Sequence, residues 1–295
     1  MKLGIIGGSG LYEIEGLKNA QEITVETPFG NPSDSIVSGE LCGTPICFLP
    51  RHGKGHRILP GELNHKANIF ALKKLGVTHI LSISAVGSLR EDFAPRDVVI
   101  VDQYFDRTKS GLAHTFFGNG IVAHVSLASP TCPELGAMAR NAATAAIASA
   151  PGNSSAKVHF GGTYINMEGP AFSTKAESKV YRAWGMDVIG MTNLGEARLA
   201  REAEICYTTV AMVTDYDCWH PAHDNVTVDM IIGNFSANVD LSRSIIKNAA
   251  KLGSAAIPGN CSCTKALAGA IITAKDKIPS KLKSELAPII GKYIS

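Results

Sequence analysis

The stretches DVIGMTN at residues 187–193 and ICYTTVAMVTDYD at residues 205–217 decide the fold. Each begins with an apolar run and ends in polar side chains, and residues 196–203 between them are rich in strong helix formers. This pattern predicts a strand, a helix and a second strand, with polar groups after each strand. Open α/β sheets bind ligands at the carboxyl ends of their strands, so we expect the functional site at that edge.

The rest of the chain repeats this alternation. Apolar runs at residues 2–6, 45–49, 78–84, 97–101 and 162–167 predict further strands, and residues 64–72, 135–150, 226–252 and the tail from Ser280 predict helices. Strands that alternate with helices are typical of the α/β class. Residues 106–133 are long and irregular, which in a compact domain indicates a functional or interface loop. We expect a single domain that spans residues 1–295.

Composition excludes several classes of protein. The chain has 295 residues, of which 45% are hydrophobic and 18% charged, as is usual for a globular protein. A net charge of +2 without a long basic run gives no electrostatic case for a nucleic-acid partner. No apolar run is long enough to span a bilayer, and the opening MKLGII is too short for a signal peptide. We therefore expect a cytoplasmic protein with no membrane partner.

The seven cysteines form neither a paired Cys-x-x-Cys zinc signature nor an even disulfide framework. Five are expected to be buried small hydrophobes, namely Cys42, Cys47, Cys132, Cys206 and Cys218. The motif CSC at residues 261–263 is either a pair of loop thiols or a strained, redox-active disulfide. His220 and His223 flank Pro221, which breaks any helix that would aim both at one ion. We expect no metal site.

Two donor clusters follow the first two strands. The glycine turn at residues 7–10 exposes backbone N–H groups and adds the hydroxyl of Ser9. It is not a dinucleotide fingerprint, because Glu13 stands where a glycine is required. Arg51 and His52 follow the second strand, and the planar guanidinium fork of arginine suits phosphate or carboxylate. A simple turn and a solvated surface pair remain the alternatives.

Two more clusters follow later strands. Ser84 and Ala85 lie in a small-residue turn, and Thr192 follows the strand that begins the decisive stretch. Donor clusters that converge at one sheet edge describe a site for a free oxyanion such as phosphate. There is no Walker-type Gly-Lys-Ser/Thr motif, so a nucleoside triphosphate is not indicated.

The other half of this edge offers carboxylates and apolar faces. Asp215 and Asp217 are separated by one residue at a strand end, where they can reach the polar edge of a purine. Phe172 offers a stacking face and Met191 a flexible apolar side chain. The alternatives are that an aspartate caps the next turn and that Phe172 and Met191 are core residues.

Six stretches together resemble the trimeric purine nucleoside phosphorylase family, and within it the enzymes that act on S-methyl-5'-thioadenosine. They are GIIGGSGL at residues 4–11, PRHG at 50–53, SAVGSLRE at 84–91, MEGPAFS at 167–173, DVIGMT at 187–192 and TDYDCW at 214–219. The resemblance implies an α/β fold with a central mixed sheet flanked by helices, a homotrimer whose pairing into a hexamer is left open, and no cofactor. One departure is Ala171, where relatives commonly carry arginine.

The resemblance also implies residue roles. The implied phosphate-binding residues are Ser9, Arg51, His52, Ser84, Ala85 and Thr192. Phe172 would pack on the base, Met191 would lie against the ribose, and Asp215 and Asp217 would read the purine as catalytic residues. The implied 5'-methylthio pocket consists of Val228, Ile231 and Ile232, with His124 from a neighbouring subunit, and the specificity positions are Ser173 and Val228.

The implied reaction is phosphorolysis of S-methyl-5'-thioadenosine to adenine and 5-methylthioribose 1-phosphate, with Asp215 protonating or hydrogen-bonding purine N7. One alternative is a purine nucleoside phosphorylase acting on inosine, guanosine or methylthioinosine, against which Asp215 and Asp217 argue. Another is a nucleoside-binding protein without catalytic activity. Phosphate-dependent release of adenine separates this last possibility from an enzyme.

Overall fold

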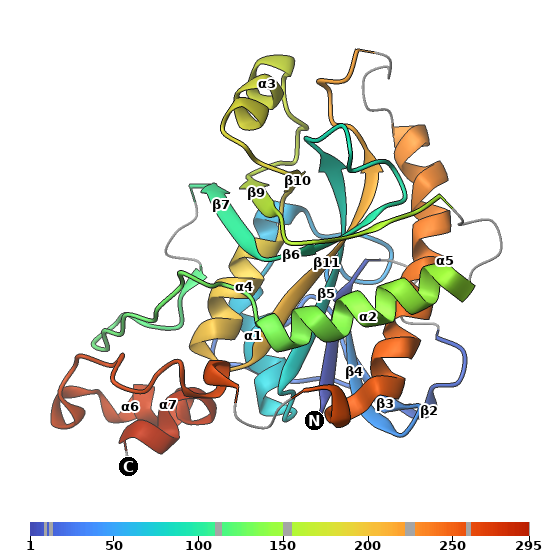
Figure 1. Ribbon diagram of the computed structural model, residues 1–295. Helices are drawn as coiled ribbons and strands as arrows, with labels where there is room; N and C mark the ends of the chain where they lie inside the picture. Colours follow the sequence, from blue (N-terminus) through green and yellow to red (C-terminus); the bar gives the residue numbers. More distant parts are fainter. Residues whose placement is uncertain are drawn as a thin grey trace.

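The computed structural model describes residues 1–8, 11, 14–109, 114–149, 155–221, 228–257 and 261–294, with the side chains of 228–237 outside the description. A large mixed β-sheet runs through the molecule (Figure 1). Its strands are β1 (Leu3–Gly7), β2 (Lys18–Ile23), β3 (Ile36–Leu41), β4 (Thr44–Pro50), β5 (His79–Ser88), β6 (Val98–Val101), β7 (Gln103–Arg107), β8 (Val158–Phe160), β9 (Thr163–Met167), β10 (Val188–Gly190) and β11 (Cys206–Asp215).

Strand β5 is the centre of the sheet. The order is β2-β3-β4-β1-β5-β10-β9-β7, and on its other side β5 pairs with β11, which leads through β6 to β8. Strands β1 and β11 run parallel to β5, whereas β10 runs antiparallel to it. The mixed α/β sheet expected from the family resemblance is confirmed.

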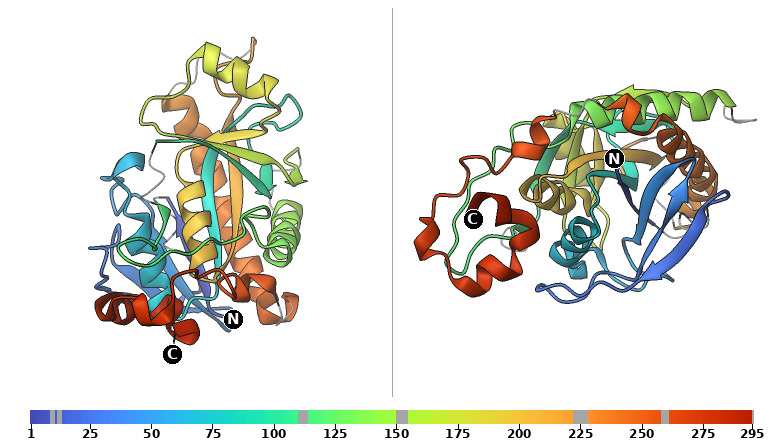
Figure 2. Two further views of the ribbon diagram at one scale, coloured as in Figure 1. Left: turned by 90° about the vertical axis from the view of Figure 1, so that its left-hand side faces the viewer. Right: turned by 90° about the horizontal axis from the view of Figure 1, so that it is seen from below.

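Helices cover both faces of this sheet. They are α1 (His65–Lys74), α2 (Pro133–Ser149), α3 (Lys175–Ala183), α4 (Asn193–Glu202), α5 (Val228–Leu252), α6 (Ser280–Glu285) and α7 (Ala287–Ile294). Side chains alternate along each strand, so Ile5 packs with α2 and α5 on one face and Ile6 packs with α1 and α4 on the other. Figure 2 shows the two helical layers on opposite sides of the strands.

Several local expectations need correction. Strands β2, β3, β7 and β8 and helix α3 are absent from the sequence prediction, although Thr174 and Glu177 form a capping box that starts α3 and is readable in the sequence. The tail is not one helix, because it breaks at Leu286, two residues before a proline. The expected burial of Cys42 is also wrong, since it is exposed on the turn between β3 and β4, and Cys218 is only partly buried.

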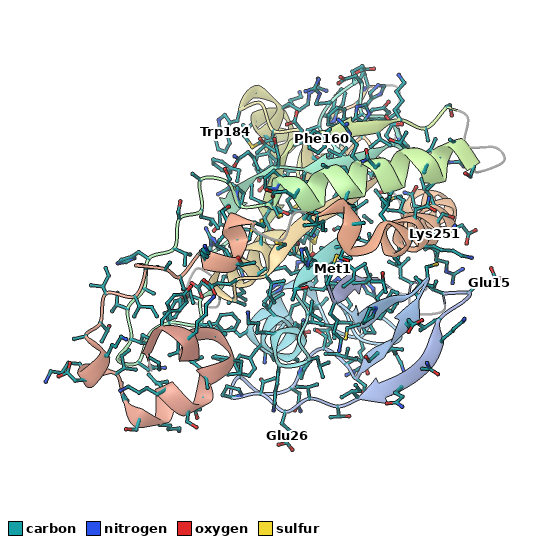
Figure 3. All side chains as sticks on the ribbon, turned by 60° about the horizontal axis from the view of Figure 1, so that its bottom comes forward. Met1, Glu15, Glu26, Phe160, Trp184 and Lys251 are labelled. Atoms are coloured by element: carbon teal, nitrogen blue, oxygen red, sulfur yellow. The ribbon has the colours of Figure 1, made fainter. Side chains whose placement is uncertain are left out.

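The outer surface carries isolated apolar side chains. Phe160 in β8 and Trp184 at the end of α3 are each 52% exposed (Figure 3). Arg140 lies over the ring of Phe160, and Phe105 contacts that of Trp184, so each is partly covered. None of the helices in the described part of the chain is long and apolar enough to cross a bilayer.

Candidate active site

A cavity of about 390 Å³ opens within the sheet, beside the middle of β5. On that side of β5 the pairing with β1 ends at Ser82, and the pairing with β10 begins at Gly87. Because β10 runs in the opposite direction, the carboxyl ends of β1 and β10 face each other along β5. The site therefore lies between two strand ends that meet head to head, and not at one common edge as the sequence predicts.

The expectation of a turn at Ser84 is wrong. Ser84 and Ala85 are inside β5, which continues to Ser88 because β11 pairs with it as far as Gly87. Both residues still line the cavity, because they lie in the gap between β1 and β10. These small residues thus form a stretch of β5 that has no neighbouring strand, within the described part of the chain, on the side of the cavity.

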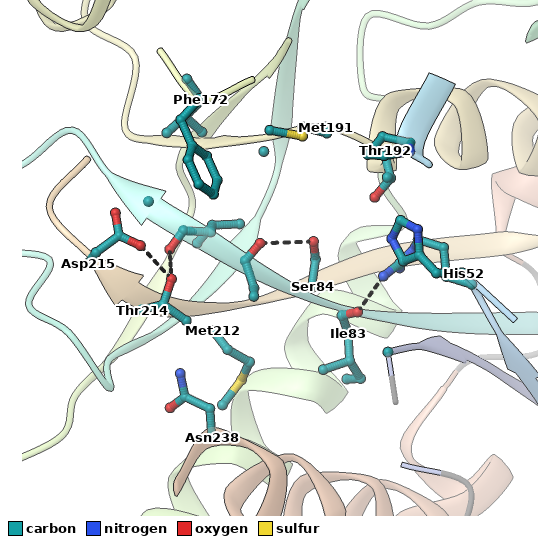
Figure 4. A pocket seen from close by; sticks show the side chains of 18 of the residues that line it. His52, Ile83, Ser84, Phe172, Met191, Thr192, Met212, Thr214, Asp215 and Asn238 are labelled. Atoms are coloured by element: carbon teal, nitrogen blue, oxygen red, sulfur yellow. Dashed lines mark hydrogen bonds between the residues drawn. The ribbon is translucent and has the colours of Figure 1, made fainter. Parts of the chain in front are cut away.

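The cavity has two chemically different ends (Figure 4). Thr192 and His52 lie at one end, and Phe172 and Asp215 lie at the other, with Ser84 between them. The fold therefore brings together the donor clusters and the carboxylates that the sequence singles out. We describe the two ends in turn as the cationic end and the carboxylate end.

Arg51 lies at the cationic end and is 3% exposed. Its Nε donates to Glu196 Oε1 at 2.6 Å, its Nη1 to the carbonyl of Ile83 at 2.9 Å, and its Nη2 to the hydroxyl of Ser82 at 2.6 Å. Burial acts to lower the pKa of Arg51, but the carboxylate of Glu196 raises it above the usual value. The guanidinium is therefore a fixed, buried cation and not a solvated one.

Glu196 anchors a buried polar network behind Arg51. Its Oε2 accepts hydrogen bonds from Ser82 at 2.6 Å and from Tyr207 at 2.9 Å. Asn193 donates to the hydroxyls of Ser82 and Thr209 at 2.8 and 2.9 Å. Sequence reasoning missed this network, because Glu196 reads only as a helix former and no local signal pairs it with Arg51.

His52 is neutral near pH 7. Burial and the adjacent charge of Arg51 lower the pKa of His52 to about 4. Its Nδ1 lies 2.8 Å from the carbonyl oxygen of Ile58, so this nitrogen carries the proton and donates. Nε2 is therefore a hydrogen-bond acceptor, whereas the sequence predicts a second donor beside Arg51.

Thr192 is the N-cap of α4, is 5% exposed and lines the cavity. Its side chain makes no capping hydrogen bond, and its hydroxyl donates to Asn193 Oδ1 at 3.1 Å. The N–H groups of Thr192 and Leu194 already donate to Tyr164 and Asn166, at 3.5 and 3.1 Å. The N-terminus of a helix also carries a partial positive charge, so α4 adds to the attraction for an anion. The hydroxyl of Tyr164 packs against the backbone of Gly190, just before Thr192. Only glycine fits there, because a Cβ at residue 190 would lie 1.9 Å from that hydroxyl.

Asp215 and Asp217 form the carboxylate end and are 7% and 6% exposed. Asp215 accepts at both oxygens, from the hydroxyl of Thr214 at 2.7 Å and from the backbone N–H of Asp217 at 2.7 Å. Among the described residues, none hydrogen-bonds Asp217 Oδ2. Burial raises the pKa of Asp215, and burial, partly offset by Ser178 and reinforced by Asp215, raises the pKa of Asp217 to about 6. Of the two, Asp217 is thus the carboxyl whose pKa is raised more and whose Oδ2 lacks a close donor in the described ranges.

Apolar groups close this end. Phe172 lines the cavity and is 52% exposed, so its ring is not a core residue. Met191 lines the same wall, with its sulfur next to Gly169. Ser173 also lines the cavity, and its carbonyl oxygen accepts from the thiol of Cys218 at 3.3 Å.

Other expected site residues are placed less directly. Ser9 lies outside the described residues, although Gly8 before it lines the cavity. Val228, Ile231 and Ile232 lie on α5, and their side chains are outside the description. His124 is exposed and is not part of this chain's cavity lining.

Known proteins resemble this chain in sequence and in fold. Residues 2–252 match the model of the phosphorylase superfamily. The S-methyl-5'-thioadenosine phosphorylase of Geobacter sulfurreducens is 56% identical over 99% of this chain and 99% of its own length. The chain belongs to the S-methyl-5'-thioadenosine phosphorylases. This confirms the family that the six sequence stretches indicate.

Further relatives agree. The S-methyl-5'-thioadenosine phosphorylase of Koribacter versatilis is 54% identical over 99% of this chain and 96% of its own length. The crystal structure of a methylthioadenosine phosphorylase from an antarctic soil metagenomic library has a TM-score of 0.91 at 47% identity, covering 98% of both chains. The Schistosoma mansoni methylthioadenosine phosphorylase in complex with adenine has a TM-score of 0.78 at 36% identity, covering 99% of this chain and 98% of its own. The phosphorylase fold thus extends over nearly the whole chain.

Proposed function

We propose that this phosphorylase cleaves S-methyl-5'-thioadenosine with phosphate, giving adenine and 5-methylthioribose 1-phosphate. The observation that carries the proposal is the single cavity with its two unlike ends. A buried cation and a helix N-terminus suit an oxyanion, and two carboxyls beside an aromatic ring suit a purine. When the glycosidic bond of the nucleoside lies between the two ends, the purine contacts the carboxylate end while phosphate is held at the cationic end.

Phosphate binds at the cationic end in this proposal. Four of the five guanidinium N–H groups of Arg51 are engaged by the contacts to Glu196, Ile83 and Ser82, which leaves one Nη1 hydrogen for an anion. Thr192, Ser84 and the N-terminus of α4 supply further donors. Neutral His52 accepts through Nε2 from a phosphate hydroxyl. We include Ser9 and Ala85 in the site, as the family resemblance implies.

The purine binds at the carboxylate end. Phe172 packs on the base, Met191 lies against the ribose, and the two aspartates face the polar edge of adenine. We assign the proton donor to Asp217, and not to Asp215 as the resemblance alone implies. Asp217 has a pKa of about 6 and an oxygen that accepts no hydrogen bond from the described part of the chain, whereas both oxygens of Asp215 already accept hydrogen bonds.

The reaction is a displacement at C1' of the ribose. A phosphate oxygen forms the new bond to C1', while the bond from C1' to N9 breaks and its electron pair goes to the purine. Protonated Asp217 gives its proton to N7, which neutralises the leaving base. The positive charge that develops on the ribose is stabilised by the adjacent phosphate, so the protein contributes mainly position and electrostatics.

Initial rates with S-methyl-5'-thioadenosine, adenosine and inosine, each with and without phosphate, test this function. We expect phosphate-dependent release of adenine, and poor cleavage of inosine because its O6 faces carboxylate oxygens. Equal cleavage of inosine would replace the proposal by a purine nucleoside phosphorylase. Tight nucleoside binding without any phosphate-dependent cleavage would replace it by a binding protein.

The 5'-methylthio group is proposed to lie against α5. Asn238, Val239 and Ser242 of this helix line the described cavity, which supports this placement. We include Val228, Ile231 and Ile232 in the pocket, as the family resemblance implies. An apolar pocket discriminates against a hydroxyl by about 10 to 200-fold. Val228→His supplies a polar partner and should lower the ratio of methylthioadenosine to adenosine activity. Lys251→His, at the exposed C-terminal end of α5 and outside the cavity lining, is the control on the same helix. Ser173 is expected to modulate the same preference.

We also propose a homotrimer in which His124 completes a neighbouring subunit's site. His124 lies on an exposed strip in which the N–H of Ile272 donates to the carbonyl of Val122, and both side chains are largely exposed, at 65% and 49%. Such an exposed apolar pair suits a subunit contact. The whole chain would fold as one domain, since Ile289 of α7 packs into the same core cluster as α1. A cytoplasmic location agrees with the seven free thiols.

A further inference from the structure

Four cysteines from three distant parts of the sequence meet in the core. The sulfur atoms of Cys132, Cys206, Cys261 and Cys263 all lie within 4.8 Å of one another, and all four residues are buried. They come from the residue before α2, the first residue of β11, and the two ends of the motif CSC. Only the folded chain brings them together, which is why their spacing in the sequence indicates no metal site.

We propose that these four thiols form a closed tetrathiolate site for one Zn²⁺ ion. Four sulfur ligands at about 2.3 Å from zinc stand about 3.8 Å apart in a tetrahedron. The sulfurs of Cys132 and Cys261 are 3.5 Å apart, and the remaining pairs lie within 4.8 Å. A disulfide requires an S–S distance of about 2.05 Å, which is much shorter than these separations. The separations are instead close to those of a tetrahedral metal site, which small shifts of the side chains would complete.

The surroundings suit bound thiolates. The N–H of Leu135 in the first turn of α2 lies 3.5 Å from the sulfur of Cys132 and donates to it, so the positive end of a long helix faces the cluster. The positive charge of Arg201 acts on Cys263 and favours its thiolate form. This charge offsets part of the net negative charge of four thiolates around a divalent ion.

Metal binding must release protons from the thiols. Both Cys132 and Cys261 donate to Glu134 Oε2, at 3.3 and 3.4 Å. Glu134 is partly exposed, which gives the two thiol protons a path to solvent as Zn²⁺ binds. The metal-sulfur bonds form without any change in oxidation state.

The site would fasten a segment that the family match does not include. The match to the phosphorylase superfamily ends at residue 252, and Cys261 and Cys263 begin the described segment 261–294. Zinc would tie this segment to the first residues of β11 and α2. The same segment carries Ile271, which pairs with Ala123 beside the exposed His124 strip. The metal therefore has a structural role, at a place outside the cavity lining.

The experiment measures metal in the purified, reduced chain. Protein produced with zinc in the medium should contain about one zinc ion per chain by plasma mass spectrometry. Cys206→Ser and Cys263→Ser should lower this content at least tenfold. Cys47→Ser is the matched control, because Cys47 is buried in the sheet but bonds to Ser38 and lies outside the cluster.

A titration of the wild-type chain avoids dependence on variants that fail to fold. Metal-free, reduced protein should bind Co²⁺ with the thiolate-to-cobalt absorption and intense visible bands of a tetrahedral sulfur site, and added Zn²⁺ should abolish both. Absence of zinc together with absence of a cobalt spectrum overturns the proposal. So does an intact mass that shows these four cysteines paired as disulfides in protein purified without oxidant.

Discussion

The two ends of the cavity are built in opposite ways. At the cationic end, Arg51 is held by Glu196, Ser82 and the carbonyl of Ile83, so its charge is paired before any ligand arrives. At the carboxylate end, Asp215 and Asp217 are buried side by side with no cation among the causes that shift their pKa values, and one oxygen of Asp217 has no partner among the described residues. At the cationic end the charge is paired within the protein, whereas at the carboxylate end a buried carboxyl lacks both a cation and, within the described residues, one hydrogen bond.

This difference separates residues that mainly hold the site in position from residues that mainly serve the reaction. A buried ion pair with satisfied hydrogen bonds holds a donor in position, although it adds little net stability. A buried carboxyl without a partner is destabilising, but its raised pKa makes it a proton donor near neutral pH. We therefore expect substitutions at the cationic end to damage the folded state, and substitutions at the carboxylate end to damage the reaction more than the fold.

The largest effect is expected on turnover. Asp217→Asn removes the proposed proton donor and should lower kcat for S-methyl-5'-thioadenosine by about 10² to 10⁴-fold. Asn also tolerates the backbone φ of 50° at this position, so the fold should persist. Asp215→Asn should cost less, because its amide oxygen can still accept the N–H of Asp217. Equal losses in the two variants would contradict the assignment of Asp217.

The next effect concerns the ion pair. Arg51→Met leaves Glu196 buried without a cation, which should lower the free energy of unfolding by about 3–5 kcal/mol in urea titrations. Adding Glu196→Gln should restore part of that stability but not the apparent affinity for phosphate, which should remain about tenfold to hundredfold weaker after loss of a charged contact. Arg57→Met breaks an exposed pair with Asp34 and should cost at most about 1 kcal/mol. Unchanged phosphate affinity in the double variant would remove Arg51 from the phosphate site.

The carboxylate end predicts a stability effect that depends on pH. Asp217 has a folded pKa of about 6 against an ordinary value of 3.8, so the folded state holds its proton more tightly. Its contribution to stability is therefore fully present below pH 3.8 and lost as pH rises through 6. A shift of this size corresponds to about 3 kcal/mol, so Asp217→Asn should raise the free energy of unfolding at pH 8 by up to that amount. Thermal unfolding should show little gain for this variant near pH 4; an equal gain at both pH values would argue against a raised pKa.

The smallest effect tests packing without charge. Gly190→Ala places a methyl group against the hydroxyl of Tyr164, and overpacking of this kind costs about 1–3 kcal/mol. Tyr164→Phe in the same chain should recover only part of the loss, since it removes the nearest atom but leaves ring carbon Cζ 2.5 Å from the added Cβ. Gly61→Ala, which meets no atom within 4 Å, is the control and should be near neutral. A neutral Gly190→Ala would mean that β10 can move away from β9, and that the cationic end is less rigid than the ion pair suggests.

Much of the chemistry could be predicted from the sequence, because it depends on short-range patterns. The apolar runs before Arg51, Thr192 and Asp215 determine strands, and the helix formers from residue 196 determine α4. The residue types after each strand indicate anion and purine binding. The stretches around them identify the family before any fold is known.

Only the tertiary structure decided how these pieces meet. The reversal of β10 relative to β5 moves the site from an edge to a gap inside the sheet, and strand direction is set by pairing between distant segments. Glu196 meets Arg51 across 145 residues, and Cys132 meets Cys261 across 129. Periodicity and turn chemistry act over a few residues, whereas these contacts arise from topology and close packing. The sequence alone therefore determined which chemical groups the chain carries, and the fold determined which of them are paired, which are left unpaired, and what they can bind.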